Sequence, residues 1–160
     1  MSDLEQGSLV YFLSAPSATQ WSDFLAVLSE ELADQMSAEE NRAFFAVLGR
    51  RIARRNPLVQ GETLQDLENF VNEFLRRSGW GWMRVRDLSS SLEFLHSCSP
   101  LRQAFGDAAM DWAPGLLEGL YGEWLKQLGA DPVLVFQQLG RPEGLPDTLR
   151  FRLAHPSQLL

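Results

Sequence analysis

Several residue types that build disulfides, membrane spans and metal sites are scarce in this 160-residue sequence. Its one cysteine, Cys98, cannot form an internal disulfide, which agrees with a reducing compartment. No apolar run approaches the roughly 18 residues that a membrane-spanning helix needs. The first residues lack a basic leading region, and the apolar run 9–13 is too short for a signal peptide. We therefore expect the chain to stay in the compartment where it is made.

Basic charge is scarce too, because the net charge is −7 and the isoelectric point is about 4.8. Phosphate backbones attract basic surfaces, so nucleic acid is not an expected partner. Arginine is nevertheless clustered in the stretch 50–55. The cluster is either a solvated helix end that complements the helix dipole or a docking site for an acidic partner. Its members are Arg50, Arg51, Arg54 and Arg55.

Motifs that carry known chemistry are missing. The sequence has no phosphate-binding glycine loop before a helix, no HExxH, no CxxC and no GxSxG. His96 is predicted to be a core histidine on an apolar strand face, and His155 lies in the C-terminal tail. Acidic residues are plentiful, so a glycosidase-like acid/base pair of carboxylates is an alternative, although Glu118 and Glu123 are expected to be solvated or salt-bridged. We expect no catalytic residue, cofactor or metal.

Apolar residues at helical spacing predict three helices in the N-terminal half. The segment before them, residues 1–18, is expected to be an N-terminal arm. The second helix opens with a capping box in which Ser37 caps and Glu40 reaches back. In chain order, the three helices are expected from Thr19 to Met36, from Ser37 to Asn56, and from Thr63 to Ser78.

The apolar period then changes from 3.6 to 2 residues, which predicts strands. Runs 80–88 and 91–97 predict two adjacent antiparallel strands, and runs 133–139 and 148–154 predict two more. A loop over 100–111 and a helix over 111–129 separate the two pairs, and 140–147 is a turn-rich loop. The fold class is therefore α+β, a single domain over 1–160 with a mainly antiparallel four-stranded sheet and a short tail, 155–160.

Alternation along the first strand puts aromatic and basic side chains on one face: Trp80, Trp82, Arg84 and Arg86. Aromatic residues and arginine are both enriched at the centres of protein interfaces. Three roles remain open for this face. It is tryptophan packed under arginine stems, an interface between subunits, or a surface on which a ligand stacks.

The helix over 111–129 contains glycines that its propensity does not explain, because each costs roughly 1 kcal/mol relative to alanine. Gly115 and Gly119 lie four residues apart on one face, and Gly122 follows three residues later. They leave a smooth surface for close packing, either on the sheet within one subunit or on a helix across a dimer. An apolar stripe that includes Tyr121 and Trp124 accompanies them.

Two stretches, "SGWGWMRVRDL" and "WAPGLLEGLYGEWL", give the chain a family resemblance. It resembles the cellulose synthase operon protein D family, the D subunits of bacterial cellulose operons, over roughly residues 20–154. The matching positions are Trp80 or Trp82 with Gly81, and then Trp112, Ala113, Pro114, Leu117, Glu118, Gly119, Leu120, Tyr121, Gly122 and Trp124.

The resemblance implies a non-enzymatic accessory subunit that forms octamers built from dimers and works beside the cellulose synthase complex. It implies that N-terminal segments line passages for glucan chains, which makes Gly7, Ser8 and Tyr11 the candidate glucan contacts. A proline-rich operon accessory protein is a further implied partner. The expected location is the cytoplasm near the inner membrane, with the periplasm as the alternative. The alternative function is an adaptor or cytoskeletal scaffold that binds a proline-rich partner without touching glucan.

Overall fold

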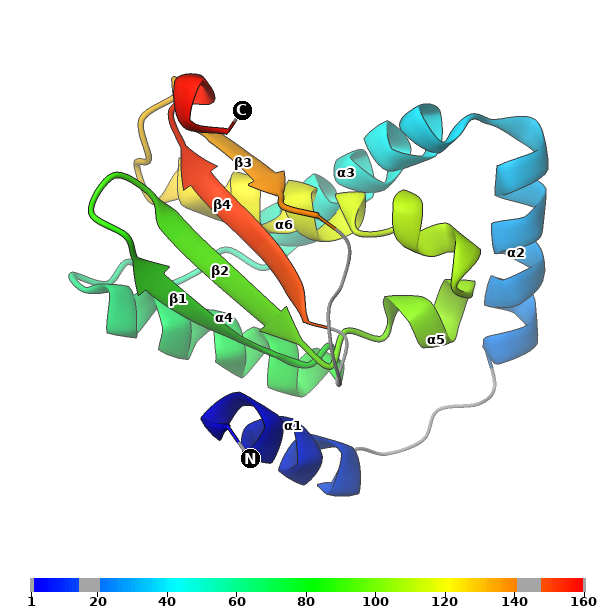
Figure 1. Cartoon of the computed structure of the whole chain (residues 1–160), viewed down its shortest axis with the longest axis horizontal. Helices are drawn as coiled ribbons and strands as arrows, with labels where there is room; N and C mark the ends of the chain where they lie inside the picture. The colour runs from blue at the N-terminus through cyan, green and yellow to red at the C-terminus, as the bar shows by residue number, and fades with distance from the viewer. Residues whose placement is uncertain (1, 15–20, 141–147, 160) are drawn as a thin grey trace.

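A computed structural model describes residues 2–14, 21–140 and 148–159 of the chain. Apart from Gly140, the loop predicted over 140–147 lies outside these residues. In chain order, the elements are α1 (Asp3–Ser14), α2 (Ser22–Gln35), α3 (Ala38–Arg55), α4 (Leu64–Ser78), β1 (Trp82–Asp87), β2 (Leu92–Ser97), α5 (Leu101–Phe105), the 3₁₀ helix η1 (Ala108–Asp111), α6 (Gly115–Gln127), β3 (Val135–Gln138), β4 (Leu149–Ala154) and the 3₁₀ helix η2 (Pro156–Gln158) (Figure 1).

Local signals in the sequence fix the ends of α3 and α4. The Ser37 side chain accepts a hydrogen bond from the Glu40 amide, and the Glu40 carboxylate accepts one from the Ser37 amide. Thr63 and Asp66 form the same reciprocal capping box at the start of α4. Gly79 ends α4 at φ 67°, a left-handed conformation that glycine adopts without strain. The predicted boundaries of these two helices are therefore confirmed.

The four strands form one antiparallel sheet in the order β1-β2-β4-β3. Alternation along β4 places Leu149, Phe151 and Leu153 on its buried face, as the sequence predicts. The predicted α+β class and the pairing of the first two strands are confirmed. Strand β3 is shorter than the predicted run 133–139.

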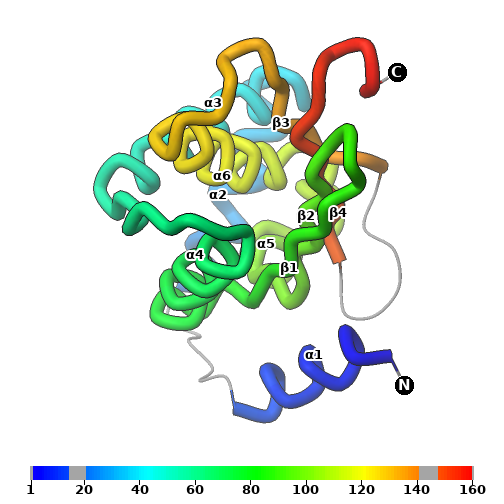
Figure 2. The backbone as a smooth tube through the Cα atoms, turned by 90° about the vertical axis from the view of Figure 1, so that its left-hand side faces the viewer, coloured from blue at the N-terminus to red at the C-terminus, as the bar shows by residue number. Residues whose placement is uncertain are grey.

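The helices α3, α4 and α6 lie on one side of the sheet and enclose the core with it (Figures 1 and 2). Among the described elements, α3 and α6 share the most extensive contact. Aromatic rings pack together in the interior: Phe94 and Phe136 of the strands meet edge to face at 5.2 Å between centroids, and Tyr121 of α6 lies tilted against Phe94 at 5.8 Å. The core is thus centred on α6, which sits between the sheet and α3.

Two segments depart from the expected layout. Residues 3–14 of the predicted arm form the helix α1, and the predicted loop 100–111 contains α5 and η1. The sequence of α1 places apolar residues all around the helix rather than on one stripe, so periodicity gives no signal for it. In Figures 1 and 2, α1 lies beyond β1 and α4, and α2 stands at the opposite end of the molecule from the β1–β2 turn.

Candidate functional site

The helix α1 packs against one end of the sheet, at the start of β1. The hydroxyl of Tyr11 accepts a hydrogen bond of 3.1 Å from the Gly81 amide. Ser8 is buried, and its carbonyl oxygen lies 3.8 Å from the Cys98 sulfur, just after β2. Three sequence-predicted positions on α1 therefore lie against the sheet at the predicted Trp/Arg strand or beside it: Gly7, Ser8 and Tyr11.

Trp82 is the side chain that α1 covers most closely. A Cβ added at Gly7 would lie 3.3 Å from the Trp82 ring, so the missing side chain lets the helix come this near. The Arg84 guanidinium lies 5.7 Å from the Trp82 ring centroid and bonds to Asp3 of α1 at 3.1 Å. Because α1 occupies this side of Trp82, a peptide or sugar reaches that side of the ring only when α1 moves aside.

The other two members of the predicted face, Trp80 and Arg86, do not share this contact. Trp80 packs against the core, with its ring 6.5 Å from the Phe74 ring. Gly81 interrupts the alternation at φ 91°, where an added Cβ would clash with the Ser97 carbonyl oxygen. Arg86 is exposed and lies 3.8 Å from Glu93 of β2. The expected four-residue face is thus split between the core, α1 and solvent.

Cys98 and His96 have structural surroundings rather than catalytic ones. Burial raises the pKa of the Cys98 thiol above its ordinary value. His96 is fully buried, with Nε2 2.7 Å from the Trp80 carbonyl oxygen and Nδ1 2.6 Å from the Tyr121 hydroxyl. A carbonyl oxygen only accepts, so Nε2 carries the proton and Nδ1 accepts from the Tyr121 hydroxyl. Burial lowers the pKa of His96 from 6.5 to about 4, so the ring is neutral at pH 7.

The Tyr121 and Trp124 side chains of α6 tie distant elements to the core. Tyr121 is fully buried, and burial raises its pKa well above the ordinary value. Its hydrogen bond to His96 links α6 to β2 and, through Trp80, to the start of β1. The Trp124 indole nitrogen donates to the Asn56 carbonyl oxygen at 2.8 Å, where α3 ends.

The glycines of α6 allow close helix–helix contact within one copy of the chain. A Cβ added at Gly119 would lie 2.7 Å from the Ala46 carbonyl carbon of α3, and one at Gly115 would lie 2.8 Å from Arg42 Cγ. Gly49 of α3 makes the reciprocal approach, because its added Cβ would lie 2.7 Å from the Leu120 amide nitrogen. Gly115 and Gly119 therefore face α3, whereas we expected either the sheet or a helix of a second copy.

Gly122 differs from the other two glycines of α6. A Cβ added there would lie 4.0 Å from the Phe136 side chain, which is ordinary van der Waals contact. Phe136 belongs to β3, so Gly122 faces the sheet. The sheet is one of the two packing partners that we expected for these glycines. The three glycines thus serve two different neighbours.

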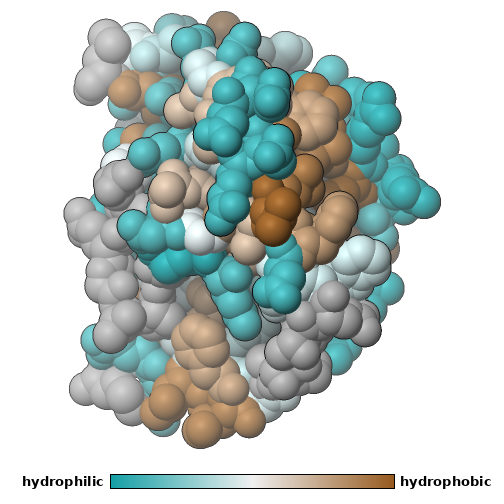
Figure 3. Space-filling view, turned by 90° about the vertical axis from the view of Figure 1, so that its right-hand side faces the viewer, coloured by the Kyte–Doolittle hydropathy of each residue, from teal (hydrophilic) through white to brown (hydrophobic). Residues whose placement is uncertain are grey.

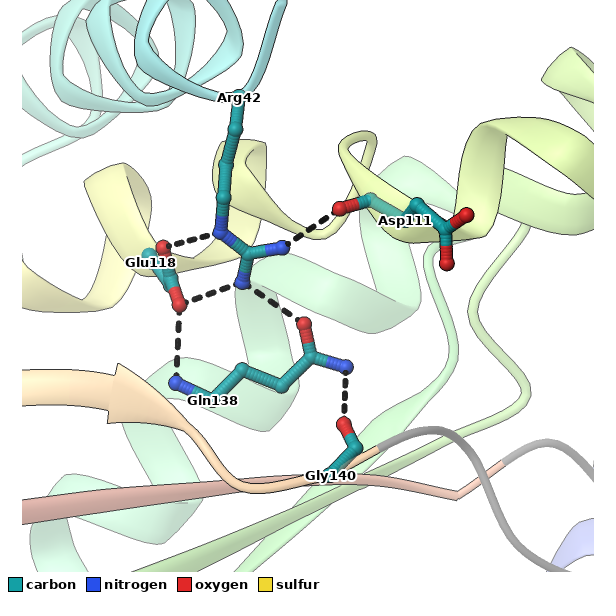
Figure 4. Close-up of polar contacts among 5 residues, drawn as sticks. All are labelled: Arg42, Asp111, Glu118, Gln138 and Gly140. Carbon is teal, nitrogen blue, oxygen red and sulfur yellow. Dashed lines mark hydrogen bonds and ion pairs between the residues drawn. The ribbon is translucent and has the colours of Figure 1, made fainter. Parts of the chain in front are cut away.

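A polar pocket of about 360 Å³ lies where α3, α6 and β3 meet. Arg42 donates to both oxygens of Glu118, at 3.2 and 2.6 Å, and to Gln138 Oε1 at 2.8 Å (Figure 4). The same Glu118 accepts a hydrogen bond of 2.8 Å from the backbone amide of Gln138. With its oxygens engaged and no second carboxylate among the described lining residues, Glu118 is placed to hold β3 rather than to transfer a proton.

Glu123 has a similar partner at the other end of α6. Its carboxylate bonds to Arg54 Nε at 3.0 Å, and this hydrogen bond lowers the pKa of Glu123. Glu118 and Glu123 are thus salt-bridged, as the sequence predicts. In the part of the chain that the structure describes, no three His, Cys, Asp or Glu side chains are grouped to hold a metal ion.

Sequence reasoning missed the exposed apolar side chains of the first two helices. The helix α2 and the residue before it expose Trp21 and Phe24, each 59% accessible, together with Val27 and Leu28. The outward side of α1 exposes further apolar side chains: Leu9, Val10, Phe12 and Leu13. The spacing of the α2 residues carries a helical signal, but the sequence alone does not separate a core stripe from an exposed one.

Comparison with known proteins decides the family. Residues 8–150 match the family model for the D subunit of cellulose synthase. The chain belongs to this family. A cellulose synthase operon protein D from Komagataeibacter xylinus is 33% identical over 110 residues, which cover 67% of this chain and 70% of that protein. A protein of the same description from Komagataeibacter sucrofermentans is 30% identical over 104 residues, covering 64% and 67%.

One solved structure of low similarity adds nothing to the family assignment. An H-NOX from Shewanella woodyi, solved with IWP-051 bound, aligns with 89% of this chain and 74% of its own at 14% identity and a TM-score of 0.42. So low a score supports no argument about fold or function. Within residues 2–14, 21–140 and 148–159, no helix combines the length and apolar character required to cross a bilayer.

Proposed function

We propose that the chain is a non-enzymatic, oligomeric accessory subunit of bacterial cellulose synthesis that guides glucan chains leaving the synthase and helps to order them. The observation that carries the proposal is the family match over residues 8–150. The geometry supports it, because the ionisable groups considered as catalytic candidates have hydrogen-bond or ion-pair partners within the chain. His96 bonds to Tyr121, and Glu118 and Glu123 bond to arginines.

The helix α1 is the element that we propose to lie along the glucan path. It is attached to the sheet through one side only, and its outward side presents Phe12 and aliphatic residues. Apolar and aromatic surface suits weak contact with a moving sugar polymer, because stacking needs no fixed hydrogen-bond register. Gly7, Ser8 and Tyr11 then act indirectly, because they hold α1 to the sheet.

The proposal places the assembly in the cytoplasm near the inner membrane, next to the synthase complex, with a proline-rich operon protein as a second partner. A buried Cys98 without a disulfide partner fits a reducing compartment. Protease treatment of spheroplasts tests the location, because a cytoplasmic protein stays intact until the cells are lysed, whereas a periplasmic one is cleaved at once.

Genetic complementation tests the function. A cellulose-producing host that lacks its own operon protein D receives either the full chain or the chain without residues 2–14. The full chain is expected to restore cellulose yield and crystallinity, measured by dry mass and X-ray diffraction. The truncated chain is expected to restore neither, while keeping the number of subunits per particle and the melting temperature of the full chain.

Two outcomes of the complementation would contradict the proposal at different levels. Normal crystalline cellulose from the strain without any operon protein D would overturn the proposed function. Full activity of the chain without residues 2–14 would remove α1 from the glucan path and leave the accessory role standing.

A further inference from the structure

The outward sides of α2 and α3 form a surface that the core does not use. On their inward sides, the Ser29 hydroxyl donates to the Phe105 carbonyl oxygen at 2.7 Å, and the buried Asn41 amide donates to the Leu32 carbonyl oxygen at 3.0 Å. The first bond holds α2 against α5, and the second holds it at its corner with α3. The exposed large apolar side chains of these helices include Phe24 and Val27 of α2, and Phe44 and Val47 of α3. Figure 3 views the molecule from the α2 side and shows apolar surface beside hydrophilic side chains.

The outward stripes of the two helices have the same plan with opposite charge. In α2 the stripe is apolar in the first half and acidic in the second, whereas in α3 it is apolar first and basic second. The positions correspond at a constant separation of 20 residues: Phe24 with Phe44, Val27 with Val47, Glu31 with Arg51, and Asp34 with Arg54. The two stripes also run in the same sense around their helices. In each helix the residue after the first stripe residue points inward, namely Leu25 in α2 and Phe45 in α3.

Most charges of the two stripes lack ion-pair partners among the described residues of one copy. The helix α2 contains four acidic residues and no basic one, and the last six residues of α3 contain four arginines. Arg54 pairs with Glu123, but no ion pair joins Glu31, Asp34, Arg51 or Arg55 to any other of the described residues. Glu31 and Asp34 of α2 and Arg51 of α3 are therefore available to another molecule, whereas Arg54 is engaged within its own copy.

A second copy of the chain, related by one two-fold rotation, offers a complementary stripe to each of the two stripes. When α2 of one protomer lies parallel to α3 of its partner, apolar residues meet apolar residues and Glu31 meets the partner's Arg51. A two-fold axis that bisects the directions of α2 and α3 exchanges the two helices, so the same rotation forms the reciprocal contact. This is the isologous geometry of most protein dimers.

We infer that the outward stripes of α2 and α3 are the interface of a two-fold dimer, in which α2 of each protomer packs in parallel on α3 of the other. The inference rests on the proposed function, since it names the surface through which the accessory subunit assembles. The outward side of α1, the other exposed apolar helix face among the described residues, carries no acidic or basic stripe of matched order. Association is expected to weaken as salt is raised, because the pairs lie at the edge of the interface.

Charge exchange tests this pairing. Glu31→Arg sets an arginine against the partner's Arg51, and Arg51→Glu sets a glutamate against the partner's Glu31, each twice in a symmetric dimer. Each single variant is expected to raise the dimer dissociation constant about tenfold or more, since like charges face each other across the interface. The double variant is expected to dimerise like the original chain. An equimolar mixture of the two single variants is expected to form heterodimers, because one of the two contacts then joins the introduced arginine to the introduced glutamate and the other keeps its original pair.

Matched controls separate the pairing from general charge effects. Glu62→Arg and Arg77→Glu change the net charge by the same amounts at exposed positions outside the stripes, and both are expected to leave the dissociation constant unchanged. Sedimentation velocity and native mass spectrometry give the masses, and far-UV circular dichroism verifies that every variant is folded.

Each outcome bears on the inference. A strict monomer at a concentration on the order of 100 micromolar contradicts both the dimer and the proposed assembly. An assembly whose mass and dissociation constant ignore the single and double stripe variants contradicts this interface but leaves the accessory function standing. Stripe-dependent dimers together with normal cellulose in a strain without the protein contradict the proposed function and support the interface.

Discussion

The contact between α3 and α6 and the contact between α1 and the sheet differ in how they are made. In the first, Gly49 and Gly119 bring two helix backbones together, and buried aromatic rings fill the space beside them. In the second, a short helix is held by one hydrogen bond from the Gly81 amide, a sulfur contact and an exposed ion pair. The α3–α6 contact leaves no room for a side chain at Gly49 or Gly119. The contact of α1 with the sheet involves few interactions.

This difference separates the core elements that hold the fold from the peripheral helices that can bind another molecule. The core leaves no buried carboxylate or histidine available for chemistry at the positions discussed, because each bonds to another side chain or to the backbone. The two peripheral helices expose large apolar side chains that the core does not need. Local stability is low where few buried contacts hold an element, so α1 and α2 are the elements expected to respond to partners.

Gly119→Ala is expected to have the largest effect, because it attacks the tightest contact. The new Cβ would collide with the Ala46 carbonyl group, which belongs to the backbone of α3 and cannot rotate away. We expect a loss of about 4 kcal/mol or more in the free energy of unfolding, measured by urea denaturation. Gly122→Ala is the matched control, because its Cβ meets Phe136 at an ordinary 4.0 Å. Equal stability of the two variants would show that α3 and α6 are not closely packed.

Acid should destabilise the core through His96. Its pKa is 6.5 in an exposed chain and about 4 in the folded one, so the unfolded state binds a proton first as the pH falls. The stabilisation is complete above pH 6.5 and is lost as the pH falls toward 4, by about 3 kcal/mol in all. Urea denaturation at pH 7 and at pH 4.5 gives the change in the free energy of unfolding for the original chain and for His96→Phe. In the variant, only the carboxylates contribute to this change. The same pH dependence in both would contradict a neutral buried His96.

Arg42→Met should weaken the attachment of β3 to α6. It removes a guanidinium that serves Glu118 and Gln138, and it leaves a largely buried carboxylate with fewer donors. The pair keeps some contact with solvent, so we expect a loss of about 2 kcal/mol in unfolding free energy rather than the larger cost of a fully buried pair. Adding Glu118→Gln to this variant should recover part of the loss. If the double variant is less stable than Arg42→Met, the unpaired charge of Glu118 is not the source of the loss.

Tyr11→Phe should have the smallest effect on global stability. It removes the hydroxyl that accepts from the Gly81 amide and keeps the ring, which costs about 1 kcal/mol in the docking of α1. Faster hydrogen exchange is expected in α1 and at Gly81, with urea denaturation of the core unchanged. Phe12→Leu, on the outward side of the same helix, is the control and should leave exchange as it is. Cooperative unfolding of α1 with the core would remove the distinction between the two contacts.

Short-range signals in the sequence predict much of the fold. The capping boxes at Ser37 and Thr63 fix two helix starts, and period-2 alternation identifies the hairpin and β4. What escapes prediction depends on contacts distant along the chain. Gly119 packs on the helix that contains Gly49, and Arg42 bonds to a carboxylate 76 residues away. The helix α1 escapes because its apolar residues surround the helix and give no period.

The candidate site was predictable in its parts rather than in its arrangement. Residues chosen for glucan contact and residues chosen from the Trp/Arg strand meet each other, because Gly7 and Tyr11 face Trp82 and Gly81. The reversal at Gly81 that sends Trp80 into the core depends on a positive φ, and alternation alone does not reveal it. Roles in glucan passage and assembly remain predictions that the experiments above address.

Hydrogen exchange followed by mass spectrometry, at concentrations below and above assembly, tests the distinction between core and periphery most directly. At low concentration we expect α3–α6 core amides to exchange slowly and α1 and α2 amides to exchange fast. At high concentration, we expect α2 and the outward side of α3 to gain protection while the core is unchanged. If assembly forms and α2 gains no protection, the central claim that the periphery docks copies of the chain is wrong.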